Sequence, residues 1–413
     1  MSKIYVLFAV LALSVSTIVA AEVAVADWPQ WRGPNRDDVS TETGLLKEWP
    51  ADGPKMVWKA DGIGRGYSSV SVSGGKIFTM GDKDGASHIF ALDMSGKIVW
   101  ETKVGKAGGN YDGTRSTPTV DGNVVYSLGQ FADLVCLQAA DGKEVWRKNL
   151  EKEFGGKMMS GWNFSESVLV DGKQLICTPG GAKGTLLALD KTNGSPIWQS
   201  SEISDAAAYS SVIAADIGGV HQYIQLTAAH VFGVDAKSGK VLWKAERKGA
   251  TAVIPTPIYF DNHVFVSSGY GIGCNCFKIT AAGGAFSAEQ VYANKEIINH
   301  HGGVVRVGDY VYGHSDNGGW TCLEMKTGAV KWKDRGVGKG AVTFADGMLY
   351  TRSEGGQGAI ALVEAKPDAY KEHGRFNQPN RAKENSWPHP VVCGGKLYIR
   401  DQDILLCYDV KAK

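Results

Sequence analysis

Twelve side chains of the sequence have the chemistry to bind a ligand, and all stand in segments that connect short apolar runs. They are Arg65, Tyr67, Arg115, Trp162, Glu166, Tyr209, His300, His301, His314, Trp387, His389 and Asp401. Arginine and histidine can hold anions or move protons, carboxylates can hold cations, and aromatic rings offer flat apolar faces. Together these residue types predict a ligand-binding site.

The histidines leave three roles open. His300, His301 and His314 lie in one stretch of the chain, and His389 follows later. They can bind a metal, serve another ligand or acid–base chemistry, or form structural hydrogen bonds. Adjacent residues of a strand point to opposite sides, so we do not expect His300 and His301 to share a metal ion. The sequence therefore assigns neither a catalytic residue nor a metal ligand.

The elements that must position these side chains repeat along the chain. Each copy reads as a short apolar strand, a polar residue, a Gly turn and a strand that ends in Trp, as in Ala91-Leu92-Asp93, Gly96-Lys97 and Trp100. Four more copies end in Trp146, Trp198, Trp243 and Trp332, and three degenerate copies contain Cys276-Phe277-Lys278, Ala361-Leu362-Val363 and Cys407-Tyr408-Asp409. A period of about 45 residues is typical of a β-propeller. Eight copies predict an all-β, eight-bladed β-propeller with four-stranded antiparallel blades.

The two ends of the repeat region predict how the ring closes. The last copy stops at Lys413 without a Trp strand, whereas Met56-Val57-Trp58-Lys59 precedes the first copy. A ring of sheets must leave no open edge. We therefore expect the N-terminal strand to close the last blade, so that residues 55–413 form one propeller domain.

Propeller geometry places the twelve candidate residues together. In a four-stranded blade, the segments leading into the first strand and the turns after the second strand lie on one face. The twelve residues come from these segments, so we expect them to converge on one mouth of the axial channel. Propeller ligands bind at such a mouth.

The N-terminal segment and the charge balance indicate location and exclude some partners. Residues 1–26 carry Lys3, an apolar run and then Ala24-Val25-Ala26, which predicts a cleaved signal peptide and a periplasmic or extracellular protein. Residues 27–54 predict an irregular arm. The net charge of +1 argues against a nucleic-acid partner. No later segment is apolar enough to span a bilayer, so we do not expect an integral membrane protein. We also expect a monomer.

The repeats resemble the pyrroloquinoline-quinone (PQQ) repeat family, whose Leu-Asp-x-x-x-Gly-Lys-x-x-Trp motif recurs here. The leader Asp27-Trp28-Pro29-Gln30-Trp31-Arg32-Gly33-Pro34-Asn35-Arg36 is similar to that of secreted PQQ-like propellers of planctomycetes. Two branches share this fold: quinoprotein alcohol dehydrogenases, which hold PQQ and Ca²⁺ on the axis, and the propeller lipoprotein of the outer-membrane assembly machine, a non-catalytic scaffold. The chain departs from both. The dehydrogenases carry a disulfide between adjacent cysteines beside the cofactor, and the nearest feature here is Cys274-Asn275-Cys276, which is not adjacent. The chain also lacks a lipid-attachment Cys near the leader.

The resemblance and the residues together favour a non-catalytic binding or scaffold protein for a protein or carbohydrate, with the ligand at the axial mouth. The alternative is a PQQ-dependent alcohol or sugar dehydrogenase. Such an enzyme would need oxygen ligands for Ca²⁺, which Glu166, Asn163 and Asp401 could supply. Its quinone would need an aromatic platform, from Trp162 or Trp387, and a PQQ carboxylate would need a partner such as Arg115. A His-centred hydrolase or lyase is a third hypothesis. No spacing among these residues is diagnostic, so the sequence assigns no cofactor.

Overall fold

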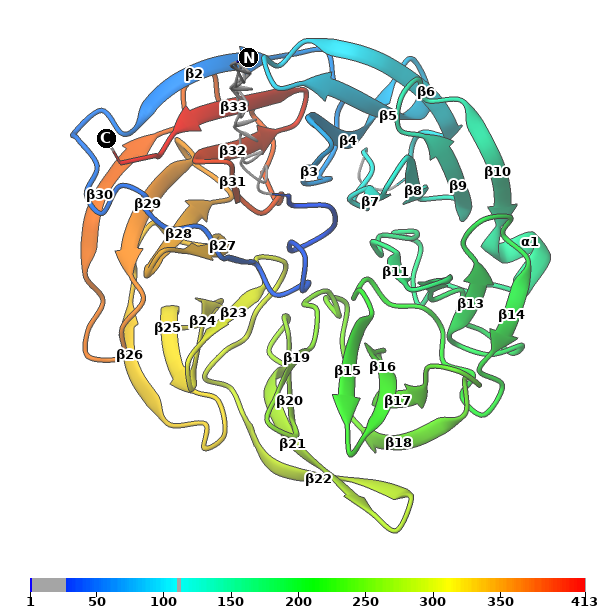
Figure 1. The fold of residues 1–413 in the computed structure, drawn as a ribbon. Helices are drawn as coiled ribbons and strands as arrows, with labels where there is room; N and C mark the ends of the chain where they lie inside the picture. The colour runs from blue at the N-terminus through cyan, green and yellow to red at the C-terminus, as the bar shows by residue number, and fades with distance from the viewer. Residues whose placement is uncertain (2–26, 110–112, 413) are drawn as a thin grey trace.

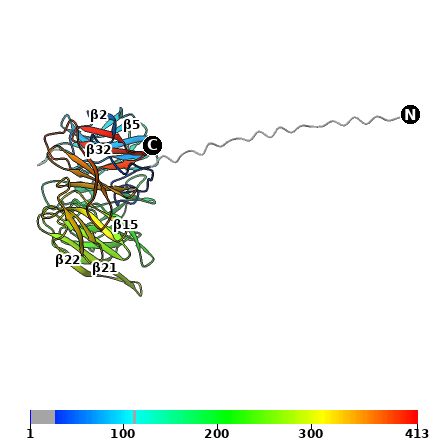
Figure 2. The ribbon, with the colours of Figure 1, turned by 90° about the vertical axis from the view of Figure 1, so that its left-hand side faces the viewer.

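The computed structural model describes residue 1, residues 27–109 and residues 113–412. In this described part, eight antiparallel sheets surround a central axis (Figure 1). From the side, the ring is a flattened disc (Figure 2). The predicted eight-bladed all-β propeller is confirmed. No helix in the described ranges has the length and apolar character needed to cross a membrane. The predicted signal peptide lies outside the described residues, apart from Met1.

The first four blades follow the chain from the axis outward. Blade 1 contains β3 (Ser71–Ser73), β4 (Lys76–Lys83), β5 (Ala86–Asp93) and β6 (Ile98–Lys106). Blade 2 contains β7 (Thr119–Asp121), β8 (Val124–Leu128), β9 (Asp133–Gln138) and β10 (Glu144–Asn149), followed by the short helix α1 (Leu150–Phe154). Blade 3 contains β11 (Leu169–Asp171), β12 (Gln174–Cys177), β13 (Leu187–Asp190) and β14 (Pro196–Gln199). Blade 4 contains β15 (Ile213–Ile217), β16 (Val220–Leu226), β17 (His230–Asp235) and β18 (Val241–Glu246).

The other four blades include two strands from the N-terminal region. Blade 5 contains β19 (Ile258–Phe260), β20 (His263–Ser268), β21 (Gly273–Ala282) and β22 (Ala285–Asn294). Blade 6 contains β23 (Val304–Val307), β24 (Tyr310–Ser315), β25 (Gly319–Glu324) and β26 (Val330–Asp334). Blade 7 contains β27 (Gly340–Ala345), β28 (Met348–Ser353), β29 (Ala359–Glu364) and β30 (Glu372–Asn377), with β1 (Val39–Ser40) added at its inner edge. Blade 8 contains β31 (Val391–Cys393), β32 (Lys396–Asp401), β33 (Ile404–Asp409) and, outermost, β2 (Lys55–Ala60).

The hydrophobic core lies between neighbouring blades. The middle strands β8 and β9 are buried almost throughout, whereas the outer strand β6 alternates between exposed and half-buried side chains over most of its length. A middle strand packs against a blade on each face, so its sequence is a continuous apolar run such as Leu134-Val135-Cys136. All seven cysteines are buried.

A Gly–Trp contact joins four pairs of neighbouring blades. Trp58 Nε1 donates to the Met94 carbonyl at 3.0 Å, and its ring covers Gly96, where an added Cβ would lie 2.7 Å from the indole. Gly96 has φ +87°, so glycine is required both for the turn and for the contact. The same pairing recurs for Trp100 on Gly142, Trp146 on Gly194 and Trp198 on Gly239. The repeated tryptophans therefore pack blade against blade.

The N-terminal strand closes the ring as predicted. Strand β2 pairs antiparallel with β33, and Trp58 is opposite Cys407. Arg400, which is buried in blade 8, donates to the carbonyls of Gly64 at 3.0 Å and Ser68 at 3.2 Å, which lead into blade 1. Main-chain pairing and a buried guanidinium thus both join the last blade to the first.

The segment between residues 27 and 54 crosses the centre of the ring (Figure 1). It contacts seven blades through Trp28 with Val72, Pro29 with Val120, Trp31 with Thr256, Arg32 with Val304, Arg36 with Ser167, Asp38 with His389 and Val39 with Phe344. We call residues 27–40 the arm loop. It plugs the axial channel.

Candidate functional site

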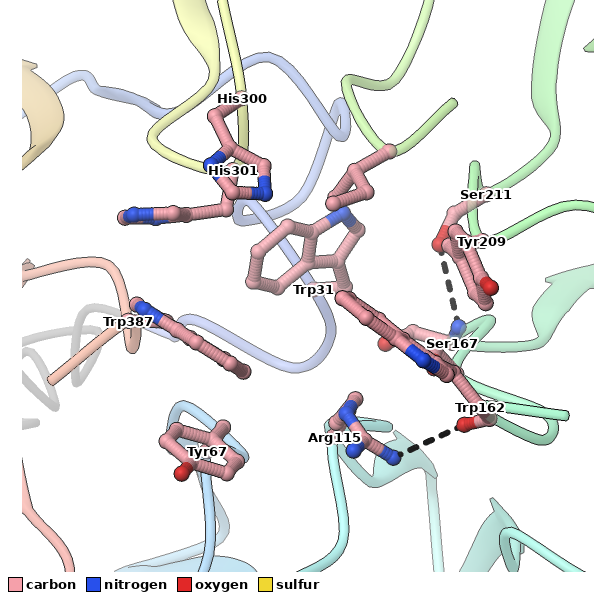
Figure 3. A pocket seen from close by; sticks show the side chains of 12 residues that line it. Trp31, Tyr67, Arg115, Trp162, Ser167, Tyr209, Ser211, His300, His301 and Trp387 are labelled. Atoms are coloured by element: carbon pink, nitrogen blue, oxygen red, sulfur yellow. Dashed lines mark hydrogen bonds between the residues drawn. The ribbon is translucent and has the colours of Figure 1, made fainter. Parts of the chain in front are cut away.

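A cavity lies on the propeller axis above the arm loop (Figure 3). It encloses about 710 Å³ of free space, its open mouth included. We call it the axial cup. Its lining is Trp31, Tyr67, Arg115, Trp162, Ser165, Ser167, Tyr209, Ser211, Ile254, His300, His301 and Trp387. Apart from Trp31, all of these residues stand in segments that lead into the first strand of a blade, the position expected for the mouth.

Trp31 of the arm loop forms the floor of the cup. Its Nε1 donates to Thr256 Oγ1 at 3.0 Å, which fixes the indole against blade 5. Below it, Arg32 and Asp38 form a buried ion pair with Nη1–Oδ2 3.0 Å, and His389 Nδ1 lies 2.8 Å from the same carboxylate oxygen. This charged cluster holds the loop that carries Trp31.

Hydroxyl groups join the cup walls around the axis. The Ser69 amide donates to Thr117 Oγ1 at 3.0 Å, the Thr117 amide to Ser167 Oγ at 2.8 Å, and the Ser167 amide to Ser211 Oγ at 3.0 Å. Each bond runs from one blade to the next. The repeated Ser or Thr thus satisfies a buried N–H that no strand partner reaches.

One side of the wall is aromatic. Tyr67 and Trp387 stack with ring centroids 4.0 Å apart and an angle of 23° between the planes. The Arg115 guanidinium lies 5.9 Å from the Tyr67 ring centroid, and its Nη1 donates to the Trp162 carbonyl at 3.1 Å. Tyr209 hydroxyl bonds Ser160 Oγ on the opposite side. The cup therefore presents flat apolar faces beside one fixed positive charge.

His301 and Trp387 share a carboxylate behind the wall. Glu354 Oε2 lies 2.6 Å from His301 Nε2 and accepts from Trp387 Nε1 at 3.1 Å. Burial opposes ionisation of Glu354, but the His301 hydrogen bond and nearby cations outweigh it and lower the pKa of the carboxyl. Burial lowers the pKa of His301. Glu354 thus fixes the orientation of two lining rings.

His300 has a different partner. Lys339 Nζ lies 2.7 Å from His300 Nδ1 and 3.1 Å from Asp316 Oδ1. An ammonium has no acceptor, so His300 Nδ1 accepts and its proton is on Nε2. Burial, His301 and Lys339 lower the pKa of His300 to about 4. Its ring is therefore a neutral hydrogen-bond donor toward the cup (Figure 3).

Seven of the twelve sequence-predicted residues line the cup: Tyr67, Arg115, Trp162, Tyr209, His300, His301 and Trp387. The other five lie elsewhere. Arg65 is exposed and pairs with Glu384 at 2.5 Å. His314 is buried, 5.7 Å edge-on to Trp320, and burial lowers its pKa to about 4. His389 lies below the floor.

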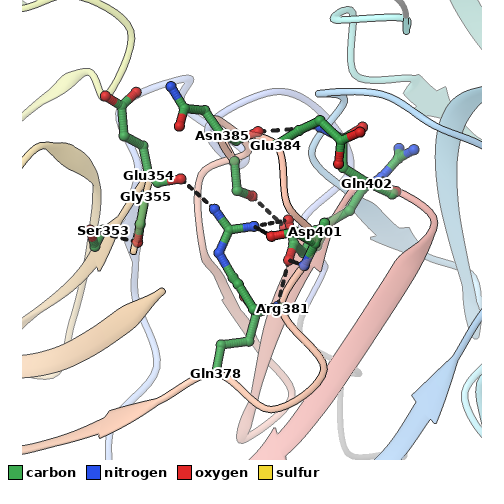
Figure 4. A network of polar contacts seen from close by, with 12 residues as sticks. Ser353, Glu354, Gly355, Gln378, Arg381, Glu384, Asn385, Asp401 and Gln402 are labelled. Atoms are coloured by element: carbon green, nitrogen blue, oxygen red, sulfur yellow. Dashed lines mark hydrogen bonds and ion pairs between the residues drawn. The ribbon is translucent and has the colours of Figure 1, made fainter. Parts of the chain in front are cut away.

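Glu166 and Asp401 are enclosed in hydrogen-bond networks. Glu166 accepts from the Thr178 amide at 2.7 Å and hydroxyl at 2.9 Å, and burial raises its pKa to about 7. Asp401 accepts from Arg381 Nη1 at 2.6 Å and from Gln378 Nε2 at 2.8 Å (Figure 4). Neither carboxylate faces the cup.

The twelve-residue set left out five residues of the lining: Trp31, Ser165, Ser167, Ser211 and Ile254. The serines had a usable signal, because each occurs just before a first strand. Trp31 had none, because the arm lies outside the repeat. It reaches the site through the threading of residues 27–40 across the axis.

The described residues do not fit a PQQ–calcium site. Within residues 27–109 and 113–412, no three His, Cys, Asp or Glu side chains are grouped to hold a metal ion. Glu166 and Asp401, two of the proposed oxygen donors, are engaged as described above. The Cys274 thiol bonds Asn294 Oδ1 at 3.0 Å within blade 5, and neither Cys274 nor Cys276 lines the cup. Ca²⁺ prefers six to eight oxygen ligands, and the described cup wall contains no carboxylate.

Comparisons with known proteins agree with the propeller. BamB, the outer membrane protein assembly factor, of Kangiella koreensis is 23% identical over 214 residues, which is 50% of this chain and 49% of that protein. BamB of Salmonella typhimurium is 32% identical over 108 residues, 26% of this chain and 27% of that protein. The chain thus spans about half or less of these curated relatives.

Solved structures show the same fold at low identity. BamB from Moraxella catarrhalis superposes with a TM-score of 0.62 at 14% identity, over 87% of this chain and 98% of that chain. Quinohemoprotein alcohol dehydrogenase from Comamonas testosteroni superposes with a TM-score of 0.65 at 12% identity, over 95% of this chain and 82% of that chain. Both kinds of propeller are therefore similar in fold.

The family is decided by the sequence of the central blades. Residues 85–334, more than half of the chain, match the sequence model described as outer membrane protein assembly factor BamB. The chain belongs to this family of PQQ-type repeat propellers.

Proposed function

We propose that the protein is a non-catalytic binding propeller that works outside the cytoplasm and holds a saccharide in the axial cup. The observation that carries this proposal is the cup itself. Trp31, Trp162 and Trp387 surround it, and serine hydroxyls lie between them. Indole faces stack on the apolar faces of sugar rings, and hydroxyl groups exchange hydrogen bonds with them.

The donor chemistry favours binding over oxidation. A quinone dehydrogenase needs a cation held by several oxygens and a base at the reacting carbon. The described cup wall offers no carboxylate to hold such a cation. Of its two histidines, His300 has its Nδ1 lone pair engaged by Lys339, whereas His301 Nδ1 has no hydrogen-bond partner among the described residues. A binding site needs neither a cation nor a base.

Titration of the mature protein with a panel of oligosaccharides, followed by tryptophan fluorescence and calorimetry, tests the proposal. We expect binding that Trp162→Ala weakens by about fivefold to 150-fold, if a sugar ring stacks on the indole with the roughly 1–3 kcal/mol that a nucleic-acid base gains on an aromatic side chain. Tyr259→Ala, an aromatic truncation in blade 5 away from the cup, is the matched control. PQQ with Ca²⁺ forms the other arm. Reduction of a dye with an alcohol or sugar, in the absence of saccharide binding, would refute the proposal in favour of the dehydrogenase.

A protein partner is the second candidate, and the family supports it. The relatives are described as outer membrane protein assembly factors. If this chain has that role, deletion of its gene lowers the amount of folded outer membrane protein in the cell. Expression of a cup variant such as Trp162→Ala in that deletion strain restores this amount.

The location of the protein has its own test. N-terminal sequencing of the exported protein should give a sequence that begins near Asp27.

A further inference from the structure

We propose that Tyr270 is a second stacking platform at the rim of the axial cup, so that the ligand is an oligosaccharide chain and not a single sugar. This rests on the proposed function, because it specifies how much of a saccharide the protein holds. Three features carry it: the exposed Tyr270 ring, the turn in which that ring stands and its contact with the cup wall.

Tyr270 leaves a large ring open to solvent. Its exposed fraction is 54%, and within residues 27–109 and 113–412 it is the only aromatic residue that is exposed. A single exposed apolar side chain is common on protein surfaces and by itself needs no functional explanation. The backbone that carries this ring makes it unusual.

The turn of Tyr270 suits a different type of residue. It runs from Gly269 to Ile272, and the Ile272 amide donates to the Gly269 carbonyl at 3.3 Å. Its two central residues, Tyr270 and Gly271, have φ +54° and +76°. Turns with two such central residues favour Asn, Asp or Gly at the first of them. A tyrosine is strained in this position, and strain at an exposed side chain points to a function of that side chain.

The same turn packs on the wall of the cup. The Tyr270 ring stands edge-on to the ring of the lining residue His300, with centroids 5.1 Å apart and an angle of 75° between the planes. A Cβ added to Gly269 would lie 3.0 Å from the His300 Cα, so glycine allows this close approach. A sugar that leaves the cup past His300 therefore meets the Tyr270 ring, and the apolar C–H face of a pyranose matches such a ring.

The surroundings leave one way out for a chain and give it room. The arm loop crosses the axis below the cup, with Trp31 fixed to Thr256, so a chain can extend only through the mouth. Beyond Tyr270, Gly271 and Ile272 of the same turn line a second cavity of about 820 Å³, its open side included, between blades 4 and 5. Tyr270 thus stands between the aromatic cup and a groove with polar side chains, in which further sugars can lie.

Titration by chain length tests the inference. The probes are gluco-oligosaccharides of one to five sugars with β-1,4, α-1,4 or β-1,3 links, measured with the mature protein by calorimetry and, for weak ligands, by displacement. In the series that binds best, we expect the disaccharide to bind at least about fivefold more tightly than the monosaccharide, the lower end of what a nucleic-acid base gains on an aromatic ring. Tyr270→Asn should bring this ratio close to one, whereas Tyr270→Phe should keep it. Trp162→Ala should weaken both ligands.

The controls separate a binding role of Tyr270 from a structural one and this inference from the proposed function. Asparagine suits the turn, so Tyr270→Asn should melt no more than about 1 °C below the wild type. Tyr259→Ala removes another ring of blade 5 and should leave the affinity ratio unchanged. An unaltered protein that binds one and two sugars equally, a Tyr270→Asn protein that keeps the ratio, or one that melts several degrees lower overturns the platform and leaves saccharide binding in place. Absence of binding by every saccharide overturns the proposed function itself.

Discussion

Replacement of Asp38 by alanine tests whether the arm loop is held by its buried charges. The carboxylate lies 3.0 Å from Arg32 Nη1 and 2.8 Å from His389 Nδ1, and Arg32 and Asp38 are both almost fully buried. Its removal leaves the Arg32 charge uncompensated in the channel. Loss of one partner of a buried pair costs about 3–5 kcal/mol. With roughly 2.1 cal/mol/K of unfolding entropy per residue over 413 residues, the melting temperature should fall by about 3–6 °C.

Differential scanning calorimetry measures this shift, and Asp52→Ala is the matched control. Asp52 belongs to the same N-terminal region but is exposed, so its replacement should change the melting temperature by less than about 1 °C. Because Asp38 positions the loop that carries Trp31, Asp38→Ala should also weaken saccharide binding while Asp52→Ala does not. An Asp38→Ala protein that melts at the wild-type temperature would show that the ion pair does not hold the arm, and the reasoning would be refuted.

Three further perturbations follow from the same contacts. Deletion of residues 54–61 removes β2 and uncovers the edge of β33, so the cooperative melting transition should broaden and move to lower temperature; an unchanged transition contradicts ring closure by this strand. Burial raises the pKa of Glu166 in the folded protein to about 7, above its unfolded value of roughly 4.3. Between these two pH values the folded state keeps the proton that the unfolded state loses. The free energy of unfolding therefore falls as pH rises from about 4.3 to about 7, by a few kcal/mol at most. Glu166→Gln should flatten this slope in urea titrations between pH 4.5 and about 7.5, and an identical slope would assign it to other groups. The ring nitrogens of His221 lie 2.6 Å from an Asp216 oxygen and 2.7 Å from an Asp171 oxygen. Burial opposes the charge of His221, but these two carboxylates outweigh it and raise the pKa of the imidazole. The contribution of His221 to folding stability is therefore complete below about pH 6.5 and is lost as pH rises through the folded pKa. His221→Gln should therefore destabilise the protein at pH 5.5 and have little effect at pH 8.5, and equal destabilisation at both values would contradict the bridge.

The fold was predictable because each blade is specified locally. The Asp93 carboxylate accepts from the Ser95 and Lys97 amides in its own turn, and Gly96 in that turn receives Trp58 from the neighbouring blade. Each of the five complete copies of the motif thus encodes both a hairpin and a blade contact. Eight copies can only continue around a ring, and the missing outer strand of the last copy identifies β2 as the closing strand. Blade 5 follows the same rule with Tyr292 in place of Trp, whose hydroxyl donates to the Met325 carbonyl at 2.7 Å.

The site was predictable only as far as the repeat positions it. Ser165, Glu166 and Ser167 are consecutive, yet the two serines line the cup and Glu166 points into the blade toward Thr178. Alternation along an extended segment requires this, but the sequence does not show which parity faces the axis. His314 and Asp401 lie at the ends of the second strands β24 and β32, where both side chains are buried. Trp31 depends on a long-range path that no local pattern encodes.

The arm loop explains how a ring of eight similar blades acquires one distinct site. Blades built from one repeat present similar inner edges to the axis. The loop breaks this equivalence because it crosses the axis and places Trp31 at the bottom of the cup. Its hydrogen bonds reach the innermost residues of seven blades, so the geometry of the floor and that of the walls are coupled. The surface of the cup is complete only when residues 27–40 are threaded across the closed ring, so the proposed site depends on closure of the propeller.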